Sequence, residues 1–413
     1  MRITSLCAIA LTLVLGSSAL LVGQDSRDWP QFRGLNRNGV ATAFSTPKAW
    51  PQQLTRKWKI DVGEGYATPI LVRDRLYVFT RQGENEVMQG IDAASGKSFW
   101  QTRYAAPVKV KPAAQPHGPG PKSTPAYADG RVFTLGMGGT VTAFDAASGK
   151  QLWQRPPDAV LPEWGTALSP LVDRGLVIVH VGGHNKGALT AFDVATGAVK
   201  WSWSGDGPSY ASPVVADLNG VHQIIALSQD NVVGVSAADG QLLWRRPFST
   251  EYAQNIITPV VIGDTVIIGG YQKPTSAFRV VRKGNAWTTE DVWQNPDVQQ
   301  FMTNPVLVGD TLFGLSSRNR GQYFLLDVKT GKTVWTGMPR QAENAAIVRA
   351  GNFVLSLEDD AELVVGQVTG SQFQEVKRYR VADGATWAAP VISADRVVVK
   401  DVSTLALWTW GDR

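Results

Sequence analysis

Residues 144–153 read Phe-Asp-Ala-Ala-Ser-Gly-Lys-Gln-Leu-Trp, which describes a strand end, a tight turn and the start of another strand. The carboxylate of Asp145 can accept backbone N–H groups two or three residues further on, and this closes an Asx-type turn. Gly149 supplies the positive φ that a hairpin turn needs without a steric penalty. Trp153 brings a large apolar surface that the outgoing strand can bury. The stretch therefore predicts a β-hairpin.

The spacing Asp-x-x-x-Gly-x-x-x-Trp of this hairpin recurs along the chain. The four complete copies run from Asp92 to Trp100, Asp145 to Trp153, Asp193 to Trp201 and Asp327 to Trp335. A fifth copy, which ends at Trp244, has Ser236 in place of the aspartate. Five related hairpins, tens of residues apart, indicate a repeat protein.

A second marker, a small residue followed by proline and an apolar run, precedes each repeat and is called the leader below. The leaders are Thr68-Pro69, Thr124-Pro125, Ser169-Pro170, Ser212-Pro213, Thr258-Pro259, Asn304-Pro305 and Ala389-Pro390, with Ala345-Ala346 in the remaining slot. Proline is tolerated at the first residue of a strand, where no ladder N–H is lost. Spacings of about 41 to 56 residues leave room for four short strands, the size of a propeller blade.

These two markers predict an all-β fold, an eight-bladed β-propeller of four-stranded antiparallel blades over residues 54–413. The last unit, residues 388–410, holds only three strands before the chain ends. Residues 54–60 alternate as a strand but have no repeat of their own. We therefore expect this N-terminal strand to complete the eighth blade and close the ring, which removes open sheet edges. Residues 24–53 form a lead segment before it.

Residues 1–23 have the pattern of a secretory signal peptide: Arg2, an apolar run and then small residues. The only cysteine, Cys7, lies inside that run, so the mature chain carries no thiol for a disulfide, a metal site or a lipid anchor. The formal charge of +5 is spread without a basic run, which argues against a nucleic-acid partner. We expect a periplasmic or secreted monomer with no transmembrane span after signal cleavage.

The candidate binding residues lie on one face. In a four-stranded blade, the loops that enter the innermost strand and those that join strands two and three emerge on the same side, called the funnel face below. Aromatic, amide and charged side chains together are typical of a binding mouth. The predicted ligand-binding residues are His117, Lys122, Glu64, Tyr66, Trp164, Tyr210, Asn255, Arg318, Asn344 and Trp387. The alternative is that they are merely solvated loop residues.

Among these residues, His117 and Lys122 are expected to reach the funnel first. They belong to the long, proline-rich loop 105–123, and long loops in compact domains tend to be functional or flexible. No catalytic residues are predicted, because no Ser–His–Asp set, P-loop or dinucleotide fingerprint is present. No metal ligands are predicted either. The acidic stretch 358–360 is interpreted as a strand-joining turn rather than a Ca²⁺ site.

With the hairpins and leaders in hand, the chain resembles the PQQ-type β-propeller repeat family over nearly all of residues 24–413. In that family the repeated tryptophan docks one blade onto its neighbour. The resemblance assigns this structural role to Trp100, Trp153, Trp201, Trp244 and Trp335, with Asp92, Asp145, Asp193 and Asp327 in the turns. The opening Trp29–Gly34 is similar to that of a group of secreted PQQ-repeat proteins.

Two branches of this family imply different functions. The quinone-dependent alcohol dehydrogenases hold PQQ and Ca²⁺ in the funnel, whereas the outer-membrane barrel-assembly branch (BamB-like) is a non-enzymatic scaffold. The modest length and the absence of adjacent cysteines favour the second branch, although its lipid-bearing cysteine is also missing. We therefore expect an exported, non-catalytic scaffold without a cofactor.

This scaffold would bind a protein or peptide partner of the cell envelope, or a small ligand, on its funnel face. The main alternative is a PQQ- and Ca²⁺-dependent alcohol or sugar dehydrogenase of reduced size. A sugar- or polymer-binding propeller is a third possibility.

Overall fold

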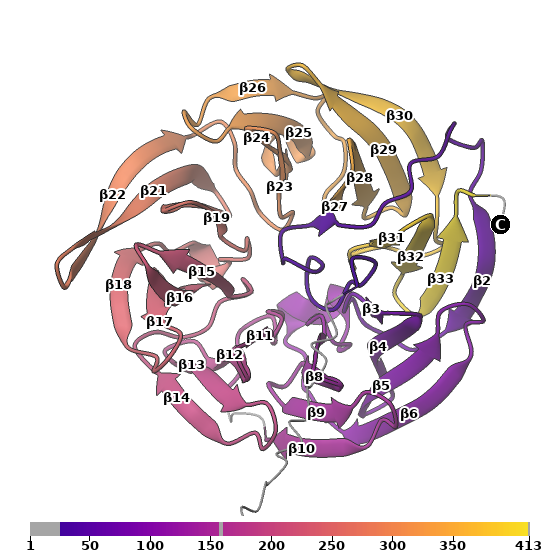
Figure 1. Ribbon diagram of the computed structural model, residues 1–413, viewed down its shortest axis with the longest axis horizontal. Helices are drawn as coiled ribbons and strands as arrows, with labels where there is room; N and C mark the ends of the chain where they lie inside the picture. The colour runs from indigo at the N-terminus through magenta and orange to yellow at the C-terminus, as the bar shows by residue number, and fades with distance from the viewer. Residues whose placement is uncertain (1–24, 157–159, 412–413) are drawn as a thin grey trace, which may run out of the picture.

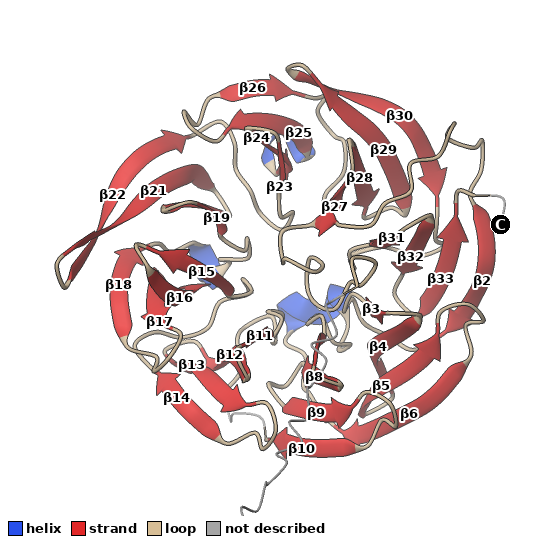
Figure 2. Cartoon of the chain, in the orientation of Figure 1, coloured by secondary structure: helices blue, strands red, loops and turns tan. Residues whose placement is uncertain are grey.

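The computed structural model describes residues 25–156 and 160–411, so the predicted signal peptide at residues 1–23 lies outside the described residues. The strands form eight sheets arranged in a ring around a central channel (Figure 1). Helices in the described residues are limited to short 3-10 turns near the loops (Figure 2). The predicted all-β, eight-bladed propeller is confirmed.

The first four blades follow one another along the chain, each with its innermost strand first. Blade 1 is β3 (Ile70–Val72), β4 (Arg75–Gln82), β5 (Asn85–Asp92) and β6 (Ser98–Ala105). Blade 2 is β7 (Ala126–Ala128), β8 (Arg131–Leu135), β9 (Val141–Asp145) and β10 (Gln151–Arg155). Blade 3 is β11 (Leu171–Asp173), β12 (Leu176–Gly183), β13 (Lys186–Asp193) and β14 (Val199–Trp203). Blade 4 is β15 (Val214–Leu218), β16 (Val221–Leu227), β17 (Asn231–Ser236) and β18 (Leu242–Pro247).

The remaining blades keep this order until the last, which takes its outer strand from the N-terminal part. Blade 5 is β19 (Val260–Ile262), β20 (Thr265–Gly270), β21 (Lys273–Lys283) and β22 (Ala286–Asn295). Blade 6 is β23 (Val306–Val308), β24 (Thr311–Ser316), β25 (Gln322–Asp327) and β26 (Thr333–Thr336). Blade 7 is β27 (Ala345–Ala350), β28 (Phe353–Glu358), β29 (Glu362–Thr369) and β30 (Gln372–Arg380), joined by β1 (Val40–Ala41). Blade 8 is β31 (Val391–Ser393), β32 (Arg396–Lys400), β33 (Thr404–Thr409) and β2 (Thr55–Asp61).

The ring closes as predicted, because β2 pairs antiparallel with β33 from Thr55↔Thr409 to Asp61↔Thr404. A buried ammonium fastens this joint: Lys400 Nζ donates to the carbonyl oxygens of Gly65 (2.5 Å), Asp401 (3.0 Å) and Val402 (3.1 Å). Burial lowers the pKa of Lys400 to about 8. The β2–β33 pairing and the Lys400 ammonium thus both connect the last blade to the chain that enters the first blade.

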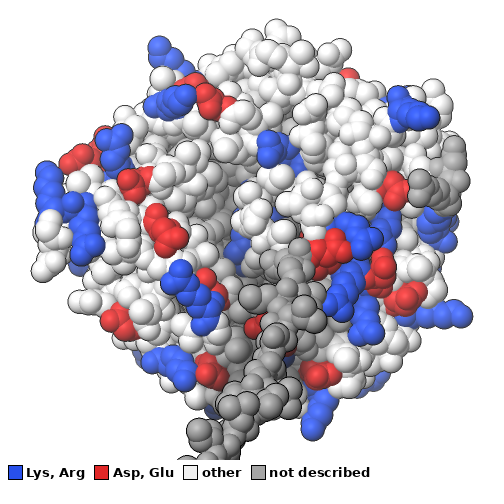
Figure 3. Space-filling view, in the orientation of Figure 1, with Lys and Arg blue, Asp and Glu red and all other residues white. Residues whose placement is uncertain are grey.

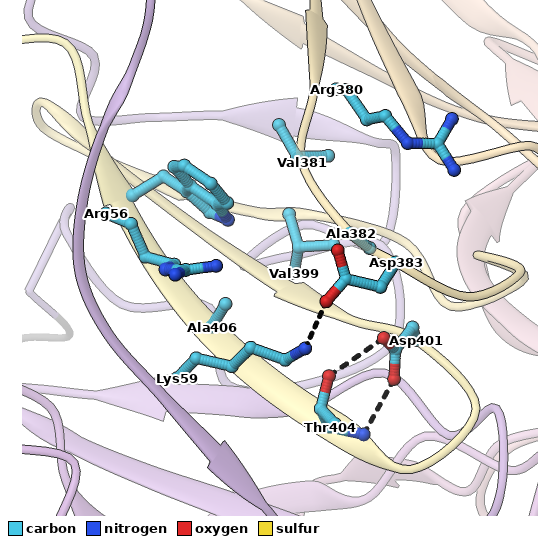
Figure 4. A pocket seen from close by; sticks show the side chains of 11 residues that line it. Arg56, Lys59, Arg380, Val381, Ala382, Asp383, Val399, Asp401, Thr404 and Ala406 are labelled. Carbon is cyan, nitrogen blue, oxygen red and sulfur yellow. Dashed lines mark hydrogen bonds and ion pairs between the residues drawn. The ribbon is translucent and has the colours of Figure 1, made fainter.

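A small cleft lies beside the closing strand, where Lys59 on β2 reaches Asp383 in the connection from blade 7 to blade 8 (Figure 4). Its volume of about 60 Å³ leaves room for a few ordered waters only. We therefore assign this cleft to ring closure rather than to ligand binding.

Tryptophans on outer strands pack against the turn of the following blade. The Trp153 ring lies over Gly197, where an added methyl group would come within 2.6 Å of the ring, and Trp153 Nε1 donates to the carbonyl of Val194 at 3.0 Å. The same arrangement joins Trp58 to Gly96, Trp100 to Gly149, Trp201 to Gly240 and Trp293 to Gly331. These glycines have φ between 66° and 74°, so both the backbone and the packing require glycine.

Two repeat tryptophans make other contacts. Trp244 Nε1 donates to Gln223 Oε1 at 2.7 Å within its own blade, because blade 5 has no Asp-x-x-x-Gly turn to receive it. Trp335 packs against Phe373 of blade 7, with ring centroids 6.1 Å apart, since the turn of blade 7 is also irregular. The contact made by each tryptophan thus depends on the turn that its neighbour offers.

The small polar residue of the leader joins neighbouring blades around the channel. The hydrogen bonds run from Ala389 N to Thr68 Oγ1 (2.9 Å), Thr124 N to Ser169 Oγ (3.0 Å), Ser169 N to Ser212 Oγ (2.9 Å) and Thr258 N to Asn304 Oδ1 (2.8 Å). Each side chain therefore accepts the N–H of the equivalent position in the preceding blade. This polar belt gives a physical reason for the residue type before the proline.

The lead segment crosses the middle of the ring (Figure 1) and forms hydrogen bonds with most of the blades. Trp29 exchanges two backbone hydrogen bonds with Leu71 of blade 1, and Pro30 O accepts from Tyr127 N of blade 2. Strand β1 then pairs parallel with β27, with Val40 opposite Arg349. Innermost strands expose one unpaired edge to the channel, and buried backbone groups need partners. The lead segment supplies some of them.

Two buried arginines of the lead segment bind carbonyls of the leader prolines. Arg37 donates to Pro170 O at 2.9 Å through Nη1 and to Pro213 O at 3.0 Å through Nη2. Arg33 Nη2 donates to Pro305 O at 2.6 Å. Burial lowers the pKa of Arg33 to about 10 and, together with the charge of Arg33, that of Arg37 to about 9. The segment thereby ties blades 3, 4 and 6 together.

Replacing Arg37 with leucine leaves two carbonyls of different blades without donors. We expect a loss of about 2–3 kcal/mol in the free energy of unfolding, because each buried acceptor left unpaired costs about 1–3 kcal/mol and burial of the charge is relieved in return. Urea unfolding followed by circular dichroism measures it. The matched control is Arg245→Leu on exposed β18; equal stability of the two variants would contradict this role of Arg37.

Candidate functional site: the funnel-face cavity

A central cavity of about 380 Å³ opens on the funnel face. Ligand sites in proteins have volumes of about 300–1,000 Å³, so this cavity is large enough for a small molecule or one or two residues of a peptide. The described residues that line it are Phe32, Arg33, Tyr66, Thr68, His117, Lys122, Thr124, Trp164, Ala167, Tyr210, Ser212, Gln254, Ile256, Thr258, Phe301, Met302, Asn304, Asn344, Ala345, Ala346, Ile347, Trp387 and Ala389. They come from the loops entering the innermost strands, from the start of β27 and from the lead segment.

The structure brings most of the predicted binding residues together in this wall. The ones that line the cavity are Tyr66, His117, Lys122, Trp164, Tyr210, Asn344 and Trp387. They belong to six different blade-entering loops, which only ring closure places side by side. Binding by these residues stays a prediction.

Three predicted residues lie outside the cavity wall. Glu64 is exposed and pairs through its backbone with Arg81. Arg318 donates to Pro296 O at 3.0 Å, outside the cavity. Asn255 requires a correction: its side chain is fully buried and donates to the carbonyls of Ser228 (2.7 Å) and Gln229 (2.9 Å). The side-chain amide of Asn255 already donates to these backbone carbonyls, and its burial prevents contact with a ligand.

Aromatic rings form two groups in the wall. The first is Tyr66, His117 and Trp387, with the His117 and Trp387 centroids 4.8 Å apart in an edge-to-face arrangement. In the second, Tyr210 Oη accepts the backbone N–H of Trp164 at 3.2 Å. Edge-to-face contacts hold rings in fixed orientations. The cavity therefore offers rigid apolar surfaces on more than one side.

Lys122 connects the two aromatic groups. Its Nζ donates to Trp164 O at 3.0 Å, and its charge contributes, after burial, to lowering the pKa of His117. Among the described residues Lys122 forms no ion pair with a carboxylate. Burial lowers the pKa of Lys122 to about 8, because removing an ammonium from water disfavours its charged form.

Phe32 and Arg33 of the lead segment also line the cavity, and the prediction from blade loops did not include them. Lead segments carry no repeat, so periodicity gave no signal there. The local signal was the opening Trp29–Gly34, with its two aromatic residues and an arginine close together in the sequence. Phe301 and Met302, also in the wall, lie in a blade-entering loop and carried no distinguishing pattern.

The wall does not fit a quinone–calcium centre. Ca²⁺ prefers six to eight oxygen ligands, with carboxylates prominent among them, but none of the described residues lining the cavity is Asp or Glu. The acidic stretch noted in the sequence is also engaged elsewhere: the buried Glu358 accepts from Tyr323 Oη at 2.9 Å and pairs with Arg378 at 2.5 Å. Asp359 and Asp360 do form the predicted turn between β28 and β29, and Asp360 is exposed; only Glu358 departs from the interpretation, since it is buried in an ion pair.

The molecular surface carries charges of both signs (Figure 3). On the part of the face in Figure 3 that is not drawn in grey, basic and acidic side chains are interspersed. Within residues 25–156 and 160–411, no helix has the length and apolar character needed to cross a bilayer.

A family profile and the sequences of known proteins both show similarity to this chain. A family profile described as outer membrane protein assembly factor BamB matches residues 38–153 and 84–337. The BamB protein of Yersinia pestis is 24% identical over 384 residues, covering 87% of this chain and 90% of its own length. That of Burkholderia pseudomallei is 24% identical over 336 residues, covering 70% and 84%. A quinone-type alcohol dehydrogenase subunit of Gluconobacter oxydans is 25% identical over 73% of this chain but only 43% of its own length.

Solved structures agree on the fold. BamB from Moraxella catarrhalis superposes with a TM-score of 0.62 at 17% identity, covering 86% of this chain and 99% of that one. A quinohemoprotein alcohol dehydrogenase from Comamonas testosteroni superposes with a TM-score of 0.65 at 14% identity, covering 94% and 81%. Identities this low show the propeller alone. The profile match spans well over half of the sequence, and the chain belongs to the BamB-like family of PQQ-type β-propellers.

Proposed function

We propose that the protein is an exported, non-catalytic scaffold that binds a protein or peptide partner of the cell envelope on its funnel face. The observation that carries this proposal is the funnel-face cavity: the lead segment and aromatic rings line it, and its described lining lacks carboxylates. Such a cavity is suited to binding rather than to metal-assisted chemistry. The BamB relatives, named as outer-membrane protein assembly factors, support a partner in the envelope.

Exposed side chains around the mouth extend the binding surface. Tyr252 in the loop entering blade 5 is 65% exposed, and Met338 in the loop entering blade 7 is 77% exposed. Large apolar side chains are rarely this exposed without a reason, and aromatic residues and methionine are enriched in protein interfaces. Other residues of the same two loops, Gln254 and Asn344, line the cavity, so one partner could contact rim and cavity together.

Site-specific photocrosslinking in cells of the source organism tests this proposal. A benzoylphenylalanine placed at Tyr252 or Met338 is expected to form an adduct with a protein recovered in the envelope fraction. The matched control is Ala147, which is exposed in a hairpin turn on the opposite face. Adducts of equal yield at Ala147, or none at either rim position, would refute a funnel-face partner.

The dehydrogenase alternative rests on the quinone-type relatives and has a separate test. Purified protein is titrated with PQQ in the presence and absence of Ca²⁺ while quinone absorbance and alcohol-dependent dye reduction are followed. Because the lining lacks carboxylates, we expect no Ca²⁺-dependent change and no dye reduction. Alcohol-dependent turnover would overturn the scaffold proposal in favour of an enzyme.

A further inference from the structure

Among the described residues that line the central cavity, two are cationic and none is acidic. Arg33 and Lys122 line it, and Arg37 lies buried in the same lead segment. Neither Arg33 nor Arg37 pairs with a carboxylate among the described residues; both donate to carbonyl oxygens. Buried charges in proteins are normally paired or neutralised, because leaving them alone is costly. Carbonyl oxygens partly offset the two arginines, but no carboxylate in the described lining balances Arg33 and Lys122, so an anion in the cavity would be favoured.

Lys122 is the cation best placed to meet a ligand. An ammonium has three N–H donors, and among the described residues Lys122 uses one of them, toward Trp164 O. It stands between the ring group of Tyr66, His117 and Trp387 and the pair Trp164 and Tyr210. A bound anion can accept the two remaining hydrogens while its attached body lies against the rings.

The same residues exclude the opposite ligand class. Aromatic cages bind quaternary ammonium groups through the faces of their rings, and rings alone would allow that here. Lys122 and Arg33 in the wall would repel such a cation, and no described lining residue is acidic. Like charges placed together in a desolvated site cost free energy. The cavity chemistry thus selects for negative charge.

We infer that the cavity binds an aromatic carboxylate without a metal, with Lys122 as the anion-recognition residue and the aromatic rings as the packing surface. This inference rests on the proposed function in treating the cavity as part of the binding face. The carboxylate can belong to the C-terminal residue of a peptide or to a free small acid, since both present the same group.

Binding measurements on the purified protein with matched probes test this inference. N-acetyl-L-tryptophan carries the carboxylate, and N-acetyl-L-tryptophanamide has the same body without the charge. We expect at least tenfold tighter binding of the acid, measured by titration calorimetry or saturation-transfer NMR. Equal affinity of acid and amide would overturn the inference.

Two further probes distinguish the sources of the carboxylate. The tetrapeptide Gly-Gly-Gly-Trp is compared with indole-3-acetate. Tighter binding of the peptide supports a chain terminus, and tighter binding of indole-3-acetate supports a free acid; binding of neither overturns the site.

Variants locate the effect. Lys122→Met is expected to abolish the preference for the acid, whereas Lys122→Arg retains it. Lys150→Met, in an exposed hairpin turn on the opposite face, is the control and should behave like the parent protein. Melting curves show whether each variant folds. A folded Lys122→Met protein with an unchanged preference would contradict the role of Lys122.

A second measurement needs no variant. Since the pKa of Lys122 is about 8, about half of its amine is neutral at pH 8, and a neutral acylating reagent should label it. We expect the acid probe to slow this labelling at least fivefold and the amide probe to leave it unchanged. Lys400 has a similar pKa but is fully buried among carbonyls, so it serves as an internal unlabelled reference. If the acid probe left the labelling rate of Lys122 unchanged, the inference would be overturned.

The two proposals fail separately. Crosslinking at the rim without any preference for the acid overturns the carboxylate site and leaves the scaffold standing. An acid preference without a crosslinked envelope partner supports the carboxylate site and overturns the scaffold.

Discussion

Deleting residues 55–61 is expected to abolish cooperative folding. The deletion removes β2, leaves β33 with an unpaired edge, and breaks the seam between blades 8 and 1. That seam includes Trp58, whose ring lies against Gly96 and whose Nε1 donates to Ala93 O at 3.0 Å. An open edge next to the buried side chains of β33 invites aggregation. Circular dichroism melting and size-exclusion chromatography measure the outcome.

The control for this deletion shortens a hairpin that takes no part in closing the ring of blades. Replacing residues 281–288 with Asn-Gly joins Val280 to Thr289, which already face each other in β21 and β22, through a favoured two-residue turn. This variant should melt cooperatively as a monomer. If the protein lacking residues 55–61 melted like the parent, ring closure by β2 would be refuted.

Replacing Trp153 with alanine should destabilise the protein by about 3–5 kcal/mol, the range for a large buried aromatic truncated in a core. Trp153 is 9% exposed and packs near Phe133 and Phe192, with ring centroids at 5.9 and 6.4 Å. It also fastens blade 2 to blade 3 through the Val194 carbonyl. Urea unfolding followed by circular dichroism gives the change in the free energy of unfolding.

A glycine pair separates docking from general packing. Gly197→Ala places a methyl group 2.6 Å from the Trp153 ring, whereas Gly284→Ala meets nothing within 4 Å. Their φ values, 66° and 59°, are similar, so the backbone cost of about 1–2 kcal/mol is common to both. Gly197→Ala should therefore be the more destabilising variant. Equal effects would show that the tryptophan does not depend on a close approach to the turn.

The repeating parts of the fold were predictable because every repeat has the same requirements on its turn and on its first strand. A hairpin needs a residue such as Gly149 at positive φ, and a first strand tolerates a proline such as Pro125. Both requirements leave a mark in the sequence at a fixed period. Even the unpaired strand at residues 54–60 was recognisable, since the last unit lacked one strand.

The cavity was only partly predictable, because loop side chains are oriented by contacts that have no period. Asn344 and Asn255 both stand in blade-entering loops, yet the first lines the cavity and the second is buried in its own loop. The roles of Arg33 and Arg37 depend on carbonyls of blades 3, 4 and 6, more than 130 residues away. No local pattern could reveal those partners.

The ammonium of Lys400 occupies the kind of carbonyl cage that a bound monovalent ion fills in other proteins. Because this cation is covalently part of β32, it neither dissociates nor exchanges with the medium. The joint between the first and last blades is therefore indifferent to chelators and to the supply of ions in the medium. The closure of the ring is in this respect set by the sequence of the chain itself.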